Sequence, residues 1–423
     1  VDAPHGLRKP REAARAGTGT TRPLWAMVQE DWIRQDPIDG TAGRYLAAAT
    51  NHLARAKATL EALRHATTPV NLRLEASELP RLTTRCASAP ADPAAARALW
   101  LEARILKRRI LLAHPLLDFG ELLVCKRAMP SWSHLVAQYF GWRQRSGGGL
   151  YALRHPGRSL ELRDLTGDRL PEGSYLEPRL SYDAKRVLFS FVACDKATPA
   201  PTSLAVNEAG SIDRYYHLYE VPVSGGAPQQ LTDGPYDDMM AEYLPDGGIV
   251  FCSSRRKGYS RCFGPEYSPR WDTYTLHRMD ADGANIRTLS QNDVSEWFPA
   301  IAHSGQILFA RWDYIDRDAV THQNLWACRP DGTNPFAVWG NGLPKPHCTF
   351  QAKPVPGSRK IVFTASAHHA ITGGPVCLLD PTLGPNDPDA VERITPLPFP
   401  EAEGAIKEWY ESPWPLSESL FLV

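Results

Sequence analysis

The segment Pro245-Asp-Gly-Gly-Ile-Val-Phe251 joins a tight turn to a short hydrophobic strand that ends in an aromatic residue. The same pattern recurs at residues 181–189, 303–309, 356–363 and 416–421, and a weaker copy without the aromatic residue lies at 118–124. The steps between the last residues of successive copies are 65, 62, 58, 54 and 58 residues. Self-similarity at a nearly constant spacing is the signature of a repeat architecture.

A second hairpin follows several of these copies. Residues 274–279 turn at Asp282-Gly283, and residues 324–328 turn at Asp331-Gly332. Asp-Gly between alternating hydrophobic residues is a strong hairpin signal. Two hairpins make four antiparallel strands, which is one blade of a β-propeller. We therefore predict a mainly β fold, a six-bladed β-propeller over residues 113–423, because a β-sandwich has no four-strand unit at near-constant spacing.

The first 112 residues follow a different pattern. Residues 1–40 are rich in Arg, Pro, Gly and Thr without periodicity, which predicts a mobile tail. Residues 41–112 predict a short helical leader, because apolar residues recur at helical spacing over 43–66 and a second helix starts at Asp92-Pro93, a good N-cap followed by proline. Between these helices, Val70–Leu74 alternates like a strand.

The last copy of the repeat stops at Val423, directly after its second strand. We therefore expect the last blade to be incomplete in this chain. Either a strand near Val70–Leu74 closes the ring, or the chain is a fragment of a longer protein. We favour the fragment, because the chain also begins at Val1 rather than at a methionine.

The composition excludes some classes of function. Lysine plus arginine and aspartate plus glutamate number 47 each, so we predict no nucleic-acid partner. No apolar run reaches membrane-spanning length.

The sequence leaves the compartment and the state of the cysteines open. A signal-peptide pattern is absent, so the location is not determined, and an exported (periplasmic or extracellular) location is included. The eight cysteines form no C-x-x-C or C-x-x-C-H motif, so this chain has no covalent haem site. Cys252 and Cys262 flank one loop, where a disulfide and two buried free thiols are both open.

Several strings together resemble a known family. They are Leu231-Thr-Asp-Gly-Pro-Tyr-Asp-Asp238, Leu276-His-Arg-Met-Asp-Ala-Asp-Gly283, Arg311-Trp-Asp-Tyr314 with Asp316-Arg317, Pro356-Gly-Ser-Arg-Lys-Ile-Val-Phe363 and Ala367-His-His-Ala370. Over roughly residues 112–423 the chain resembles the middle, β-propeller domain of the hydrazine synthase alpha subunit and its bacterial relatives. Its repeats are similar to those of TolB-like propellers. The resemblance implies a fold and a lineage but not the activity, because that enzyme works at c-type haems outside its propeller and C-x-x-C-H is absent here.

Loops that lead into the first strand of a blade and out of the second strand emerge at the same end of a propeller. We therefore expect these loops to form one mouth, where loops on a rigid scaffold commonly bind ligands. The residues predicted to contact a ligand there are Asp237, Asp238, Glu296, Arg311, Trp312, Asp313, Tyr314, His368 and His369. His347 and Cys348, together with His368, have donor atoms for zinc. Carboxylates at a mouth suit Ca²⁺, although no loop has a dedicated calcium spacing.

Each of these predictions has a structural alternative. Asp237 and Asp238 also suit a turn cap or bonds to neighbouring backbone amides. The run Arg311-Trp312-Asp313 equally suits an ion pair between blades, stacked on an indole. His368 and His369 point to opposite sides of an extended segment, so at most one of them faces the channel.

Two functions of different classes follow from these patterns. The first is a scaffold or recognition domain of a larger bacterial protein, whose partners are its other domains or subunits. The alternative is a metal- or haem-dependent redox enzyme, or a subunit of one, with its site at the mouth of the propeller. No motif of the G-x-S-x-G, G-x-x-x-x-G-K or H-E-x-x-H kind occurs, so the sequence indicates no particular reaction.

Overall fold

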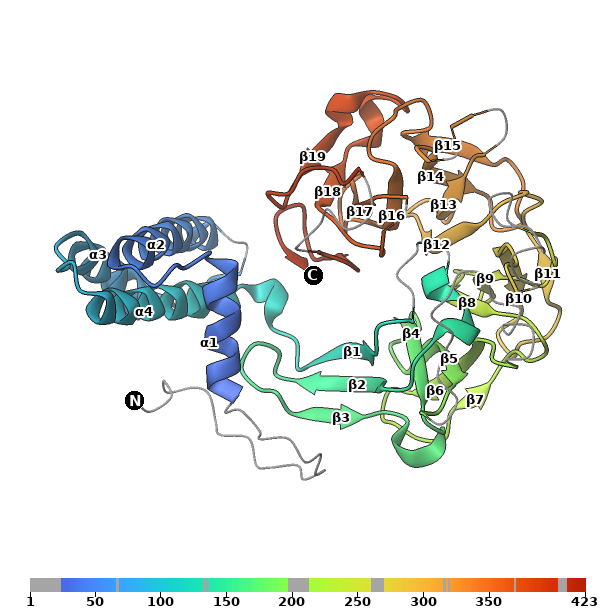
Figure 1. The fold of residues 1–423 in the computed structure, drawn as a ribbon, viewed down its shortest axis with the longest axis horizontal. Helices are drawn as coiled ribbons and strands as arrows, with labels where there is room; N and C mark the ends of the chain where they lie inside the picture. The colour runs from blue at the N-terminus through green and yellow to red at the C-terminus, as the bar shows by residue number, and fades with distance from the viewer. Residues whose placement is uncertain are drawn as a thin grey trace. The chain divides into compact units, whose positions relative to one another are not determined.

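The chain forms two compact units (Figure 1). The computed structural model describes residues 24–65, 68–131, 135, 137–196, 213–259, 270–314, 317–318, 320–368, 370–401 and 409–423. The first unit comprises residues 1–122 and 153–162, and the second comprises residues 123–152 and 163–423. None of the described helices combines the length and hydrophobicity that a bilayer-spanning segment needs.

The first unit is helical. Its helices are α1 (Leu24–Gln35), α2 (Ala42–Arg64), α3 (Arg73–Ala87) and α4 (Pro93–Leu112), followed by the 3₁₀ turn η1 (Pro115–Leu117). The Thr41 side chain caps α2 by accepting from Arg44 N, and the Asp92 side chain caps α4 by accepting from Ala95 N. Apolar residues of α2, α3 and α4 pack into one core, which includes Leu53, Leu60, Leu82, Trp100 and Leu106. The helical leader predicted from the sequence therefore has a core of its own.

Two predictions for this region are wrong. Val70–Leu74 is not a strand, because α3 already begins at Arg73 and Val70 packs against the helical core. The tail predicted for residues 1–40 is replaced over Leu24–Gln35 by α1, and residues 1–23 lie outside the described residues. Helix α1 packs Trp32 and Ile33 on the same core, a tertiary contact that local periodicity does not reveal.

Asp36 ties the end of α1 to α2 and α4. Its Oδ2 atom lies 2.7 Å from His52 Nε2 and accepts a hydrogen bond from Trp100 Nε1 at 2.7 Å. The same carboxylate pairs with Arg104, whose side chain is almost fully buried. Burial alone raises the pKa of Asp36, but the hydrogen bonds of His52 and Trp100 and the charge of Arg104 outweigh burial and hold this pKa below its usual range.

The second unit is built from antiparallel sheets. Two sheets have four strands each: β4 (Gly173–Leu180), β5 (Arg186–Ala193), β6 (His217–Pro222) and β7 (Gln229–Gln230); β8 (Asp238–Tyr243), β9 (Ile249–Ser253), β10 (Thr275–Met279) and β11 (Arg287–Thr288). An eight-stranded sheet consists of two more groups of four: β12 (Glu296–Ile301), β13 (Ile307–Trp312), β14 (Gln323–Cys328) and β15 (Phe336–Trp339); β16 (Cys348–Pro354), β17 (Ile361–Ser366), β18 (Val376–Leu379) and β19 (Val391–Arg393). A single parallel pair, Gln323 with Cys348, joins these two groups, and each group is treated below as a four-stranded sheet of its own. A three-stranded sheet contains β1 (Glu121–Arg127), β2 (Gly148–Arg154) and β3 (Leu162–Asp164), and a two-stranded sheet contains β20 (Trp414–Pro415) and β21 (Phe421–Leu422).

The four-stranded sheets are arranged as the blades of a β-propeller. The four-stranded sheets follow one another around an arc in chain order (Figure 1). Their first strands lie side by side, because β4 contacts β8, β8 contacts β12, β12 contacts β16, and β16 contacts β20. The turn-and-strand repeat of the sequence supplies the second strand of each sheet, β5, β9, β13, β17 and β21. The mainly β fold with an N-terminal helical region is therefore confirmed.

Every first strand of the four-stranded sheets contains the same bulge. The pairing register shifts in each, next to a residue with positive φ: Glu177, Met240, Phe298 and Gln351 have φ between 46° and 55°. Ser412, just before β20, has the same conformation. Residues other than glycine rarely adopt it, so its recurrence at one position shows that the blade geometry imposes it.

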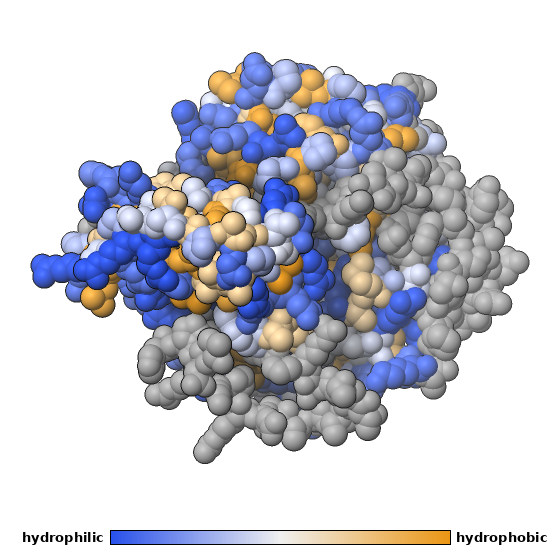
Figure 2. Space-filling model, turned by 60° about the vertical axis from the view of Figure 1, so that its left-hand side comes forward, coloured by the Kyte–Doolittle hydropathy of each residue, from blue (hydrophilic) through white to orange (hydrophobic). Residues whose placement is uncertain are grey.

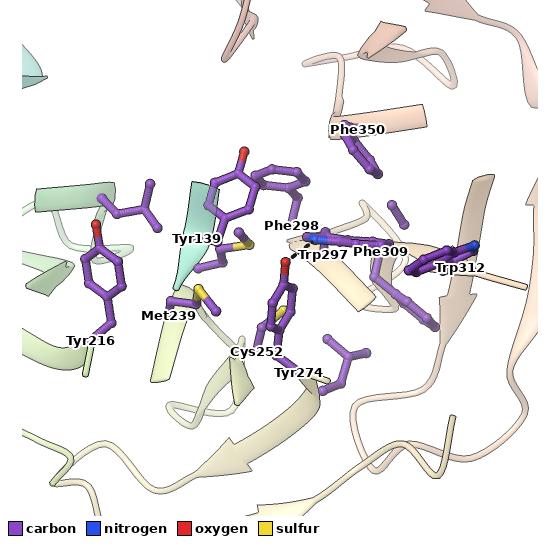
Figure 3. Packing of buried hydrophobic residues seen from close by; sticks show 14 of the residues in the cluster. Tyr139, Tyr216, Met239, Cys252, Tyr274, Trp297, Phe298, Phe309, Trp312 and Phe350 are labelled. Atoms are coloured by element: carbon purple, nitrogen blue, oxygen red, sulfur yellow. Dashed lines mark hydrogen bonds between the residues drawn. The ribbon is translucent and has the colours of Figure 1, made fainter. Parts of the chain in front are cut away.

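The largest apolar core lies at the centre of the propeller sheets. Trp297, Phe298 and Phe350 come from first strands and pack with Tyr139 and Tyr274 (Figure 3). Trp297 Nε1 donates to Tyr274 Oη at 2.8 Å, which satisfies the indole inside the core. Figure 2 shows hydrophilic and hydrophobic residues interspersed over the described part of one face.

Candidate functional site

Strand register places the predicted mouth residues at one end of the sheets. Asp238 pairs with Ser253, Glu296 pairs with Arg311, and Cys348 pairs with Ser366. In each pair the first residue of the first strand lies opposite the end of the second strand. The loops before the first strand and after the second therefore share one end of each sheet, which we call the mouth end.

A segment of the chain itself occupies this mouth end. Residues 137–144, here called the plug, form two 3₁₀ turns, η2 (Ala137–Tyr139) and η3 (Gly141–Arg143), between β1 and β2. Tyr139, Phe140 and Trp142 are at most 2% exposed. The ring of Phe140 packs on Trp271 and Tyr274, and that of Tyr139 packs on Phe298. The plug therefore belongs to the central core (Figure 3).

Polar contacts tie the plug to several blades. Tyr139 Oη donates to Thr372 Oγ1 at 2.6 Å, in the loop after β17. Trp142 Nε1 donates to the carbonyl oxygen of Arg270 at 3.3 Å, in the loop after β9. Gly141 has no room for a side chain, because a Cβ atom there would lie 2.8 Å from both Asp237 Oδ1 and Tyr215 Cα.

Asp237 is the anchor of the plug. Its Oδ1 atom accepts hydrogen bonds from the backbone N–H groups of Gly141 and Tyr216, both at 2.9 Å. Burial raises the pKa of Asp237 to about 6, against the attraction of Arg270, whose Nη2 lies 4.0 Å from Oδ2. The structural alternative for Asp237, bonding to backbone amides, is confirmed.

The other two predicted carboxylates also have partners within the protein. Asp238 receives two hydrogen bonds from Arg255, at 3.0 and 2.7 Å, and one from Ser253 Oγ at 2.6 Å. Glu296 accepts from Leu276 N at 3.0 Å and from Ser290 Oγ at 2.7 Å, and burial raises its pKa. Both carboxylates stabilise the blades from inside.

The predicted aromatic residues meet between the third and fourth complete sheets. The ring centroid of Trp312 lies 5.5 Å from that of Tyr314, in a stacked arrangement, and 5.2 Å from the His368 ring. Trp312 and His368 are both buried. The structure therefore brings His368 to Trp312 and Tyr314, which are more than 50 residues earlier in the sequence, while His369 lies outside the described residues.

Arg311 and Asp313 make contacts within their own blade. The Arg311 guanidinium lies over the Trp326 ring, 4.6 Å from its centroid. Asp313 pairs with Arg317 at 2.8 Å. The arginine does stack on an indole, as the structural alternative proposes, but the ion pair of Asp313 is local and does not join two blades.

The proposed zinc donors lie at the start of β16. Cys348 is fully buried in the central core, and burial raises the pKa of its thiol. His347 is buried beside it. Among the residues that the structure describes, no group of three or more histidine, cysteine, aspartate or glutamate side chains is placed to hold a metal ion. Zinc at His347 and Cys348, and Ca²⁺ at the mouth, stay predictions. Cys252 is a buried free thiol, and Cys262 lies outside the described residues.

A second cluster, which sequence reasoning missed, lies at the opposite end of the first strands. Two residues after each positive-φ residue, the five first strands carry the inner ring: Arg179, Glu242, Ala300, Lys353 and Trp414. The four that belong to complete sheets are close to the turns that join first and second strands, which we call the turn end. For every member except Ala300 the signal is a charged or aromatic residue in the first strand, and it is visible only once the strands are aligned by their bulges.

Arg179 holds the charges of the inner ring together. It donates to Glu242 at 2.6 Å and to Glu177 at 2.7 Å. The Arg179 and Glu177 side chains are each 9% exposed. Burial alone lowers the pKa of Arg179 and raises that of Glu177, but the mutual attraction outweighs burial, so the arginine pKa is raised and the glutamate pKa is lowered. The cluster is an ion-pair network at the propeller axis.

The sequence comparisons cover a small part of the chain. No family model matches it. An uncharacterised protein of Agrobacterium fabrum is 22% identical over 115 residues, which are 27% of this chain and 34% of that protein. The chain therefore matches about a third of the length of this curated relative.

The structure comparisons return the two groups that the sequence resembles. Hydrazine synthase from Kuenenia stuttgartiensis is 16% identical with a TM-score of 0.49, over 72% of this chain and 42% of that chain. A putative TolB from Agrobacterium tumefaciens is 17% identical with a TM-score of 0.41, over 65% of this chain and 81% of that one. TolB from Acinetobacter baumannii is 13% identical with a TM-score of 0.40, over 73% and 60%. The chain is similar to these proteins.

Proposed function

We propose that this chain is a non-catalytic scaffold or recognition domain of a larger bacterial protein, with that protein's other domains or subunits as its partners. The observation that carries the proposal is the plug. A reaction site at the mouth needs accessible side chains, whereas Tyr139, Phe140 and Trp142 fill the mouth end. The carboxylates Asp237 and Asp238 are used to hold the plug and the blades.

The proposal includes a six-bladed ring. The sheet of β1–β3, the four complete sheets and the sheet of β20–β21 count as six blades. In this arrangement β1 takes the place of a second strand, and β20 and β21 take the places of a first and a second strand. The common bulge supports the assignment of β20, because Ser412 precedes it with the same backbone conformation as the other first strands.

Metal and haem content of the purified full chain tests the proposal. We expect elemental analysis to find no transition metal near one atom per chain, and the visible spectrum to lack a haem band. A stoichiometric transition metal that is lost in the His347→Ala variant, but retained in the His303→Ala variant, would favour the redox enzyme. His303 is a suitable control because its ring contacts a backbone oxygen, that of Val355, at the turn end.

A further inference from the structure

Lys353 differs from the other charged residues of the inner ring. Its side chain lies on β16 and is 8% exposed, yet among the described residues it makes no hydrogen bond or ion pair. Its Nζ atom lies over the Trp414 ring, 5.1 Å from the ring centroid. An ammonium group has three donors, and burying it without an acceptor is costly. Within the part of the chain that the structure describes, the ammonium group of Lys353 therefore has no acceptor.

The neighbouring acids do not supply this acceptor. Glu177 and Glu242 act on Lys353 through space, but both accept their hydrogen bonds from Arg179, at 2.7 and 2.6 Å. Arg179 itself repels Lys353. The guanidinium therefore competes for the acids and leaves the ammonium without a partner at hydrogen-bond distance.

The other side of Lys353 is apolar and accessible. Trp414 is 46% exposed, and Ala300, at the corresponding place on β12, brings no charge and is buried in an apolar core. We propose that the inner ring binds a small aromatic monocarboxylate, which accepts hydrogen bonds from Lys353 Nζ and packs on the Trp414 indole. A single carboxylate matches the Lys353 ammonium, and a planar apolar body matches the exposed Trp414 ring.

This site has a distinct pH dependence. Burial, together with the repulsion of Arg179, lowers the pKa of Lys353 to about 8, and Glu242 and Glu177 oppose the shift. A bound carboxylate stabilises the ammonium form and so raises this pKa. The affinity is therefore expected to be constant at neutral pH and to fall as the pH rises above about 8.

Competitive amine labelling of the unmodified full chain tests the proposal. The labelling of each lysine by acetic anhydride is followed by mass spectrometry against pH, at constant ionic strength, with benzoate, with its neutral analogue benzamide, or without either. We expect benzoate to move the midpoint of Lys353 labelling upward by about one pH unit, because an opposite charge within ~4–6 Å shifts a pKa by that order. Lys360, a partly exposed residue paired with Glu418 at 2.8 Å, serves as the internal control.

Each outcome of the labelling experiment either supports or overturns the proposed site. An upward shift with benzoate alone, confined to Lys353, supports the site. Benzoate is tested up to about 10 mM, a concentration at which even a weak ligand would bind. If the labelling midpoint of Lys353 does not shift at that concentration, or shifts equally with benzamide, the proposal is overturned. Calorimetry adds a second measurement: Lys353→Met should weaken benzoate binding about tenfold or more, whereas Lys360→Met should not. If Lys353→Met fails to fold, the labelling of the unmodified chain still decides. Metal content is independent of this result, so the site and the scaffold proposal can fail separately.

Discussion

At the scale of single residues, two buried aspartates show that the surroundings can shift the pKa of the same chemical group in opposite directions. Asp36 stays ionised because His52, Trp100 and Arg104 surround it, so its pKa is lowered. Asp237 has only two backbone N–H groups and a distant arginine, so burial dominates and its pKa is raised to about 6. The two residues therefore respond to acid in opposite ways.

Asp237 is predicted to be critical as an acceptor rather than as a charge. Asp237→Ala leaves the N–H groups of Gly141 and Tyr216 buried without a partner, at about 1–3 kcal/mol each in free energy of unfolding. Asp237→Asn keeps an oxygen for both donors and should cost less. Urea unfolding at pH 7 compares the variants, and equal losses in both would contradict the acceptor role.

The pH dependence of Asp237 has a defined sign. Its folded-state pKa of about 6 lies above the ordinary value of 3.8, so its contribution to stability is fully present below pH 3.8 and is lost as the pH rises through about 6. Stability profiles between pH 4 and 7 should be flatter in Asp237→Asn than in the unmodified chain. Identical profiles would show that the carboxyl titrates normally in the fold.

Asp36 should behave in the opposite way. Its pKa is lowered from 3.8, so its contribution is present above that value and is lost as the pH falls below it. Asp36→Ala also leaves the buried Arg104 without a counterion, a change that costs about 3–5 kcal/mol. Hydrogen exchange should show faster exchange in α1, and Asp31→Ala, an exposed change on the same helix, is the control. If the protection of α1 is unchanged in Asp36→Ala, Asp36 does not hold α1 to α2 and α4.

At the scale of elements, the plug is the feature that decides what the mouth end can do. It is a loop between β1 and β2, yet it packs like a core strand because three of its side chains are large and aromatic. Its close approach to Asp237 and Tyr215 depends on the absence of a side chain at position 141. The plug therefore buries the mouth end of the sheets, where the loops would otherwise be open to a ligand.

Gly141→Ala tests how tightly the plug fits. The new methyl group would meet backbone atoms of Tyr215 and Arg214 at 2.8 and 2.9 Å, so the plug must move, at a cost of about 1–3 kcal/mol in stability. Gly43→Ala in α2 meets nothing within 4 Å and should be neutral or slightly stabilising. Denaturant titration measures both, and a neutral Gly141→Ala would mean that the plug has room to shift.

At the scale of the whole propeller, the inner ring joins blades that are distant in the sequence. Arg179 lies on β4 and Glu242 on β8, and Lys353 on β16 acts electrostatically on both. Residues of non-adjacent blades can influence one another only because the first strands share an axis. The ion pairs at the turn end and the apolar plug at the mouth end thus stabilise the same ring from its two ends.

Arg179→Met is predicted to destabilise the propeller as a whole. It leaves Glu177 and Glu242 partly buried without their cation, which costs about 3–5 kcal/mol. Arg186→Met removes a more exposed pair with Glu220, 3.2 Å apart, and should cost at most about 1 kcal/mol. Chemical denaturation of both variants measures the difference, and similar small losses would show that the axis network adds little.

Local patterns determined much of this protein. The turn and alternating hydrophobic residues of 245–251 predict β9 and its neighbours, because strand period and turn chemistry act over a few residues. Asp237 was placed at the mouth, with backbone bonding as an alternative, on the same reasoning. Val70–Leu74 shows the limit of such patterns: five alternating residues suit a strand, but Val70 and Leu72 pack against the helical core and α3 begins at Arg73.

The amino-acid sequence by itself therefore determined the repeat, the type of blade and the end of the sheets on which the loops emerge. Only the tertiary structure decided that Tyr139, Phe140 and Trp142 would fill that end, and that Lys353 would lie beside Trp414 with no ion pair to any described residue. The physical reason is the distance along the sequence over which each interaction acts. Hydrogen-bonded turns and side-chain alternation are set by neighbours along the chain, whereas burial and charge pairing depend on which distant strands meet at the axis.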